Sequence, residues 1–218
     1  MKWLNWIERK MGRHSISGLM RYLCLAMLGV FILDFLSRFG FLSQSASSLL
    51  VFDKNRIMQG EVWRVITFVF LPPDRSLLLI LLSLYFYYIF GTSLENHWGS
   101  ARFNIYYAIG VLGNIAAGFI MGKATNEYLN LSLMLAFAVL YPDMEIRLFF
   151  IFPVKIKWIG WLTAAVLLYQ FALVSWPLRL AIVLSLLPFI LFFGPQAWLQ
   201  ARMDGRRLAY WIRRKLDK

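Results

Sequence analysis

Residues 60–70 of the chain read GEVWRVITFVF, and residues 77–102 read LLLILLSLYFYYIFGTSLENHWGSAR. The second stretch opens with an apolar run of about 20 residues, the length of helix that crosses a hydrocarbon core. The run ends in a Gly-x-x-x-Glu pattern formed by Gly91 and Glu95, and a Trp63-Arg64 pair precedes it in a long connection. These two stretches predict a membrane-spanning helix that follows a loop with structure of its own.

The composition of the whole chain indicates a membrane protein. Of its 218 residues 60% are hydrophobic, whereas apolar residues make up about half of a soluble domain even when glycine is counted. The net charge of +12 lies mostly next to the apolar spans, where membrane topology and anionic lipid explain it. No Gly-rich phosphate loop is present. We therefore expect membrane lipids, and not nucleic acid, as partners.

Few residues could hold a metal or a redox cofactor. The chain contains one cysteine, Cys24, and two histidines, His14 and His97, with no spacing typical of a metal site. We expect no metal and no cofactor. Cys24 lies in an apolar run, where a small buried hydrophobic role is expected.

The apolar runs predict six spans, and each is expected to be a helix because lipid offers the backbone no hydrogen-bond partners. The predicted ranges are 19–40, 77–96, 103–122, 126–141, 158–175 and 179–199. The predicted fold is an all-α polytopic bundle over residues 19–199. A basic amphipathic segment is expected before it, at residues 1–18, and another after it, at residues 200–218.

The distribution of lysine and arginine predicts the orientation. Most of these residues lie on the inner side if both termini are placed there. We therefore expect an integral multi-pass protein with both termini cytoplasmic, in the plasma membrane of a prokaryote or the endoplasmic reticulum membrane of a eukaryote.

Three features within the bundle suggest special packing. The connection 41–75 is long, and we interpret it as a partly membrane-embedded, re-entrant hairpin with Trp63 at the interface. The fourth span is about 24 Å long, too short to face lipid along its whole length. Gly118 and Gly122 form a small-x-x-x-small pair, which lets helices approach closely.

The Trp-Arg pair, the Gly-x-x-x-Glu pattern and the Gly-Ser-x-Arg at residues 99–102 resemble the rhomboid superfamily, whose founding members are intramembrane serine proteases. The resemblance implies a re-entrant loop after the first span and a short, central fourth helix that carries the serine. It also implies that Glu95 has a structural role and ties the second span to its neighbours.

The same resemblance shows that the catalytic residues are altered. Asn130-Leu131-Ser132-Leu133 stands where Gly-x-Ser-Gly belongs, so that Ser132 takes the nucleophile's place without either glycine. On the second span, Leu79 and Ser83 take the places of the histidine and the asparagine that help to hold the oxyanion. The last span has no histidine, and a serine without a base is a poor nucleophile. We expect no cleavage, with Ser132 as a helix serine that bonds the carbonyl four residues earlier or a neighbour.

Residues 131–161 look like the derlins, the rhomboid-like pseudoproteases of membrane-protein quality control. Derlins also share features outside this segment, namely Gly-Glu-x-Trp-Arg before the second span and the aromatic run 84–88. Within the segment, the shared feature is a Phe-Phe pair followed by the turn 153–158. The resemblance implies client membrane proteins and, as a further partner, a cytosolic or membrane-bound AAA protease or unfoldase. The chain has no obvious long cytosolic tail with a box that would recruit such a partner.

The main hypothesis is therefore a pseudoprotease that binds transmembrane segments of clients and perturbs the bilayer. The residues expected to do this are Trp63, Arg64, Ser83, Asn130 and Ser132. Trp63 would anchor the loop and Arg64 would contact headgroups or loop carbonyls, although a purely structural role suits both. The alternatives are an active protease that uses Ser132 with another base, and a small transporter or channel.

Overall fold

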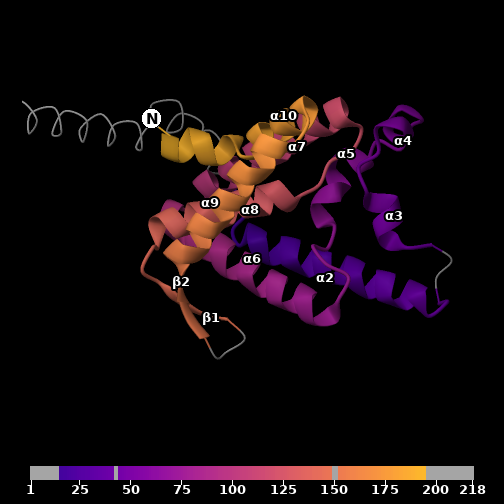
Figure 1. Ribbon diagram of the computed structural model, residues 1–218. Coiled ribbons are helices and arrows are strands. Elements are labelled where there is room, and N and C mark those ends of the chain that lie inside the picture. Colours follow the sequence, from indigo (N-terminus) through magenta and orange to yellow (C-terminus); the bar gives the residue numbers. More distant parts are fainter. Residues whose placement is uncertain (1–14, 42–43, 149–151, 195–218) are drawn as a thin grey trace, which may run out of the picture.

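The computed structural model describes residues 15–41, 44–148 and 152–194 of the chain. They form a bundle of helices with a two-stranded hairpin at one end and a group of short helices at the other (Figure 1). The predicted amphipathic segments lie almost wholly outside the described residues.

Within the described residues, four helices are long and apolar enough to cross a membrane. They are α2 (Leu19–Arg38), α6 (Leu77–Trp98), α7 (Ser100–Met121) and α9 (Ile156–Leu173). Helix α10 (Trp176–Ser185) and the helical segment Leu187–Gly194 make a fifth if the bent pair is counted as one span. Helix α8 (Glu127–Leu140) is apolar but shorter. Each of the six predicted ranges thus holds a helix, and the structure supports a polytopic helical protein with four or five candidate spans.

The last of these helices differs from the prediction. It begins at Trp176 and not at residue 179, because Pro177 fits the first turn of a helix, where no N–H is needed. It then bends by 54° after Ser185. Pro188 explains the break, since it has no N–H to donate to the carbonyl of Leu184 four residues earlier.

Small residues on α7 receive this broken helix. A Cβ atom added to Gly113 would lie 2.1 Å from the backbone oxygen of Leu184, so only glycine allows the approach. One turn away, a Cβ atom on Gly110 would collide with Leu129 of α8 at 2.2 Å. A polar contact reinforces the packing, because the hydroxyl of Ser185 donates to the Asn114 side-chain oxygen at 2.7 Å.

The predicted glycine pair at 118 and 122 does not bring two helices together. Gly118 faces the ring of Phe52 and the side chain of Ala124, both outside the long helices. Gly122 has a φ of 84° and ends α7 as its C-cap. The close helix contact of α7 lies instead at Gly110 and Gly113.

The connection 41–75 is a series of short helices and not a simple hairpin. It contains α3 (Ala46–Leu50), α4 (Lys54–Met58), α5 (Arg64–Thr67) and the 3₁₀ helix η2 (Phe68–Phe70). Asp34 near the end of α2 holds its start, accepting hydrogen bonds from Ser45 Oγ at 2.8 Å and from the Ser47 N–H at 2.9 Å. A carboxylate that receives these donors fixes where the chain turns back toward the bundle.

The prediction of an all-α chain is wrong in one place. Strands β1 (Glu145–Leu148) and β2 (Phe152–Lys155) pair antiparallel between α8 and α9. Pro142 follows α8 within two residues and cannot continue it. The chain beyond therefore satisfies its backbone by strand pairing, with Glu145 opposite Lys155.

Replacement of Gly113 by alanine should destabilise the fold. The new methyl group meets a backbone oxygen, which cannot move without shifting α10, so a loss of about 1–3 kcal/mol is expected. Thermal unfolding of the purified protein in detergent measures this loss. The matched control is Gly29→Ala, because a Cβ atom at Gly29 in α2 has nothing within 4 Å. Equal stability of the two variants would contradict the packing described for α7.

Candidate functional site

Ser132, the residue at the nucleophile's place, lies in the core of the bundle. Its exposed fraction is 0%. Its hydroxyl donates to the carbonyl of Leu129 at 2.7 Å, three residues earlier and not the four expected. The hydroxyl of Tyr106 on α7 lies 3.2 Å from Ser132 Oγ and 3.0 Å from the Ser132 carbonyl. The serine proton is therefore held by a backbone oxygen of its own helix.

The surroundings of Ser132 contain no general base among the described residues. Its side-chain partner Tyr106 packs its ring against Trp98 at 5.3 Å and against Phe192 of the last helical segment at 5.1 Å. The rings of Trp98, Tyr106 and Phe192 thus lie on the side of Ser132 from which a base on the last helix would approach. His97 lies at the end of α6 with its ring 5.9 Å from that of Tyr141. His14 lies outside the described residues.

Leu79 and Ser83 occupy the oxyanion positions, and because Tyr87 lies beside Asn130, Ser83 is about level with the start of α8 and Leu79 about one turn past it. They lie two turns and one turn before Tyr87 on the same face of α6. Helix α6 has 22 residues and α8 has 14, so their lengths are about 33 Å and about 21 Å. Leu79 is 42% exposed, and Ser83 is half-buried. Leu79 has no side-chain donor, and Ser83 donates no hydrogen bond within the described part of the chain.

Asn130 has unused hydrogen-bonding capacity in the core. It is 2% exposed, and neither its side-chain nitrogen nor its side-chain oxygen has a hydrogen-bond partner. The Tyr87 side chain on α6 lies beside Asn130, but the pair does not reach the geometry of a hydrogen bond. The hydroxyl of Tyr107 on α7 is buried and unpartnered as well. Buried polar atoms of this kind are costly unless a partner or water satisfies them.

Asn126 was not singled out by the sequence analysis, yet it attaches the loop to α8. Its side-chain nitrogen donates to the carbonyls of Val69 and Leu71, both at 3.0 Å. It is buried, and it lies at the N-cap position of α8 without capping the helix. An asparagine before an apolar run normally predicts a helix cap. The sequence therefore predicts a role for this position but not the long-range contact with the loop.

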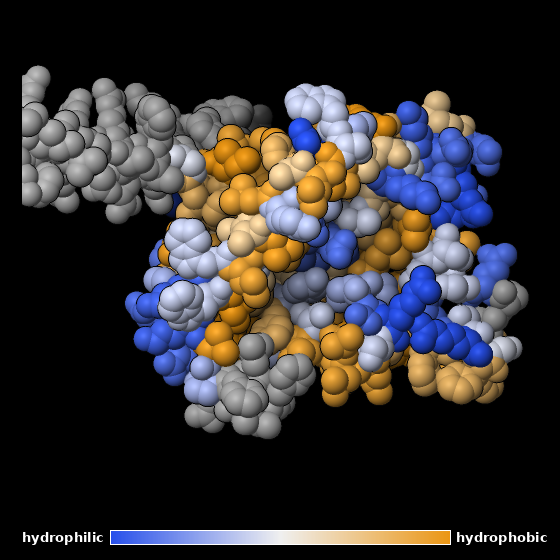
Figure 2. Space-filling model, viewed as in Figure 1, coloured by the Kyte–Doolittle hydropathy of each residue, from blue (hydrophilic) through white to orange (hydrophobic). Residues whose placement is uncertain are grey.

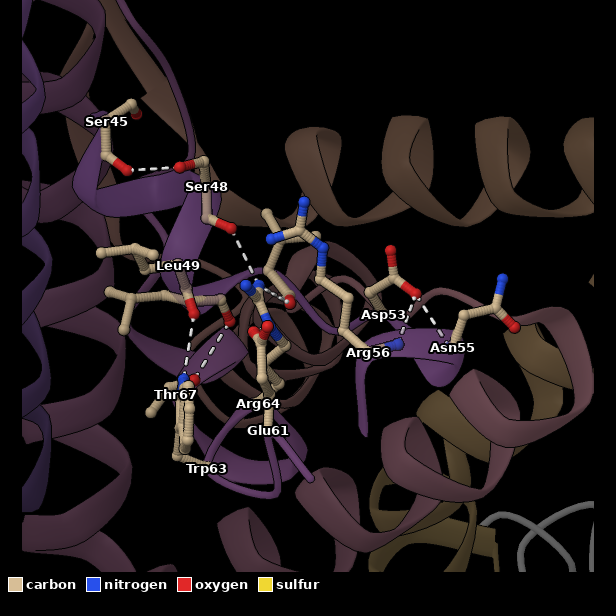
Figure 3. Close-up of polar contacts among 12 residues, drawn as sticks. Ser45, Ser48, Leu49, Asp53, Asn55, Arg56, Glu61, Trp63, Arg64 and Thr67 are labelled. Carbon is tan, nitrogen blue, oxygen red and sulfur yellow. Dashed lines mark hydrogen bonds and ion pairs between the residues drawn. The ribbon is translucent and has the colours of Figure 1, made fainter. Parts of the chain in front are cut away.

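Arg64 holds the loop together from its centre, where Figure 3 shows it beside Glu61. It is 1% exposed. Its Nε pairs with Glu61 Oε2 at 2.5 Å, and its Nη1 donates to the carbonyls of Ser48 at 2.8 Å and Val51 at 3.0 Å. Its Nη2 is buried without a partner. Of the two roles predicted for Arg64, the structure thus contains the contact with loop carbonyls.

Trp63 lies at the surface of the same loop. It is 51% exposed, and its Nε1 donates to the carbonyl of Leu49 at 3.3 Å. Exposed large apolar side chains surround it in sequence, among them Met58 at 77%, Val62 at 65% and Ile66 at 61%. An indole with one end bonded and the rest exposed beside apolar neighbours suits a membrane interface.

Gly91 and Glu95 connect α6 to its neighbours. Glu95 Oε1 accepts hydrogen bonds from the N–H of Gly18 at 2.7 Å and from Ser100 Oγ at 2.6 Å. A Cβ atom on Gly91 would lie 2.3 Å from Met20 of α2. The carboxylate thus binds the start of α2 and the start of α7 to the end of α6.

One face of the molecule is hollowed at its centre. Figure 2 shows pale and blue residues there, framed by orange ones. The described residues contain no group of three or more His, Cys, Asp or Glu side chains that could hold a metal ion.

Removal of the Arg64 side chain should loosen the loop. Arg64→Ala deletes three charge-assisted hydrogen bonds and leaves two carbonyls and Glu61 without that partner, so a loss of about 1.5–3 kcal/mol is expected. Thermal unfolding in detergent measures the loss, and limited proteolysis with chymotrypsin measures opening of the loop. Arg56→Ala, at an exposed position of α4 in the same loop, is the matched control and should change little. Equal effects of the two substitutions would contradict the central place given to Arg64.

The Rhomboid domain, as a family pattern, matches residues 59–185, more than half of the chain. No curated protein matches the chain.

Proposed function

The chain belongs to the rhomboid family, and from this premise we propose that it binds transmembrane segments of other proteins without cutting them. The observation that carries the proposal is the hydrogen bonding and the surroundings of the Ser132 hydroxyl. Its proton is bonded to the Leu129 carbonyl and its neighbour is a tyrosine packed among aromatic rings. A serine in this setting has no activating base.

The place where a client would bind is the recess beyond the short helix α8. Tyr87 lies beside Asn130, one turn into α8, so the face of α6 that carries Ser83 and Leu79 reaches the start of α8 and extends past it. The loop covers α8 from outside through Asn126, so a client segment would enter from the side and not from the aqueous phase. This direction of entry suits a partner that is itself embedded in the bilayer.

The chemistry of the recess favours spans with polar groups. Ser83 offers a half-buried hydroxyl one turn from Tyr87. Asn130, one turn into α8 and 2% exposed, has a donor and an acceptor that no described residue uses, and a client would have to reach it at the start of α8. Polar side chains and unpaired backbone groups are costly in hydrocarbon. A client span that contains them would gain partners by leaving the lipid for this site.

The proposal includes a six-span topology with both termini cytoplasmic, where α8 and the bent α10 count as spans. It also includes a role in membrane-protein quality control or as an adaptor, like that of the derlins. Trp63 and its exposed apolar neighbours would seat the loop in the interface and thin the bilayer beside the recess. An AAA protease or unfoldase is the partner that would act on a bound client after its capture.

A fluorophosphonate probe tests whether Ser132 is reactive. We expect no labelling of the wild type in membranes, because the hydroxyl lacks a base and is fully buried. An active rhomboid protease labelled in parallel is the positive control. Labelling that is lost in Ser132→Ala would instead make the chain an active intramembrane serine protease.

Photocrosslinking in native membranes tests client binding. A photoreactive residue at Leu79 or Ser83 should capture spans of other membrane proteins. The same residue at Leu168, which is 70% exposed on α9, should capture lipid and few proteins. Mass spectrometry identifies the captured spans, and these should be enriched in polar residues relative to the membrane proteome. Equal capture at Leu168 and Ser83, or crosslinks within the chain alone, would contradict a client recess on α6.

A further inference from the structure

A second site lies at the opposite end of α8, away from the recess. A groove of about 330 Å³ runs between α8 and α9, and Phe189 of the last helical segment also lines it. Its walls are apolar side chains of the two helices. One end is different, because Pro142 and Lys157 lie there, beside the hairpin.

Small residues create the groove. The two helices touch where a Cβ atom on Gly160 would lie 2.6 Å from the Cβ of Ala138. One turn farther along α9, Ala164 also lines the groove and leaves space that a larger side chain would fill. Helix α9 is the least buried of the four long helices, with 17% of its apolar window inside the protein. The groove therefore opens toward the lipid.

The size of the groove selects among possible occupants. A helix with its side chains is about 10 Å wide and needs a broad trough. A volume of about 330 Å³ between two touching helices offers room for a slender flexible chain instead. In a bilayer the apolar chains that surround α9 are lipid acyl chains, whose burial in an apolar groove is favourable.

The charged end of the groove selects the headgroup. Lys157 Nζ lies 3.2 Å from Asp143 Oδ1, and both side chains are partly exposed, at 40% and 74%. Beside them Glu145 faces Lys155 across the hairpin. Lys157 and Asp143 thus place one positive and one negative group side by side at the end of the groove, which complements a zwitterionic headgroup.

We propose that this groove binds phosphatidylethanolamine, with one acyl chain between α8 and α9 and the headgroup at Lys157 and Asp143. The lipid phosphate accepts from the Lys157 ammonium, and the lipid ammonium donates to the Asp143 carboxylate. Phosphatidylcholine has no N–H to donate to Asp143. Phosphatidylglycerol has no cation and would bring its negative charge close to that carboxylate.

Native mass spectrometry of the purified full-length protein tests this. The protein in detergent is given equimolar phosphatidylethanolamine, phosphatidylcholine and phosphatidylglycerol with identical acyl chains. We expect bound phosphatidylethanolamine to exceed each of the others by about three- to tenfold, the range of partly exposed ion pairs and hydrogen bonds.

Four variants separate the contributions. Lys157→Gln should reduce phosphatidylethanolamine binding by about threefold or more, and Asp143→Asn should abolish the preference over phosphatidylglycerol. Ala164→Phe should fill the groove and remove the bound lipid, with thermal unfolding to verify its fold. Lys123→Gln, at an exposed lysine between α7 and α8, is the matched control and should change nothing.

Three outcomes would overturn the proposal. Equal binding of the three lipids would mean a nonspecific lipid shell, and stronger binding of phosphatidylglycerol would mean simple attraction to the basic chain. Loss of client crosslinks with unchanged lipid binding in Ala164→Phe would make the groove a helix site.

Discussion

The shortness of α8 is the constraint on which the rest of the structure depends. It packs beside α6, which is about 12 Å longer, so space remains past its start that some other part of the protein must occupy or border. In hydrocarbon that space cannot expose unpaired backbone groups. The chain meets this requirement with a folded loop above α8, the face of α6 at its side, and a strand hairpin beyond its other end.

Two side chains make the loop part of the bundle. Arg64 binds loop segments to one another through carbonyls of α3 and the residue after it, and Asn126 binds the loop's end to α8. Both contacts join positions far apart in sequence. They hold the loop together and attach it to the start of α8. The packing of Tyr106, Trp98 and Phe192 beside Ser132 belongs to the same core.

Much of this architecture could be predicted from the sequence, because helices in lipid must be long and apolar. The apolar runs located all six helices, and the Trp-Arg and Gly-x-x-x-Glu patterns identified the family that the Rhomboid domain match confirms. Contacts between distant residues could not be predicted in this way. The Gly118 and Gly122 pair has the spacing of a helix contact, yet Gly110 and Gly113 make it, since a glycine pattern does not reveal which neighbour faces it. Pro188 could be read from the sequence, but the direction of the bend that it causes could not. That direction depends on the contact of the Leu184 carbonyl with Gly113 of α7. Ser132 differs again: its role as a nucleophile or a helix serine depends on neighbours from α7 that only the fold supplies.

Co-reconstitution with a single-span client tests the central claim most directly. The protein and a fluorescently labelled span that carries one asparagine are placed together in liposomes, and energy transfer and cleavage are measured on the same sample. If the chain binds polar spans without cutting them, energy transfer to this span exceeds that to an all-leucine span, with no cleavage fragment in either the wild type or Ser132→Ala. A fragment that appears with the wild type and disappears with Ser132→Ala would contradict it.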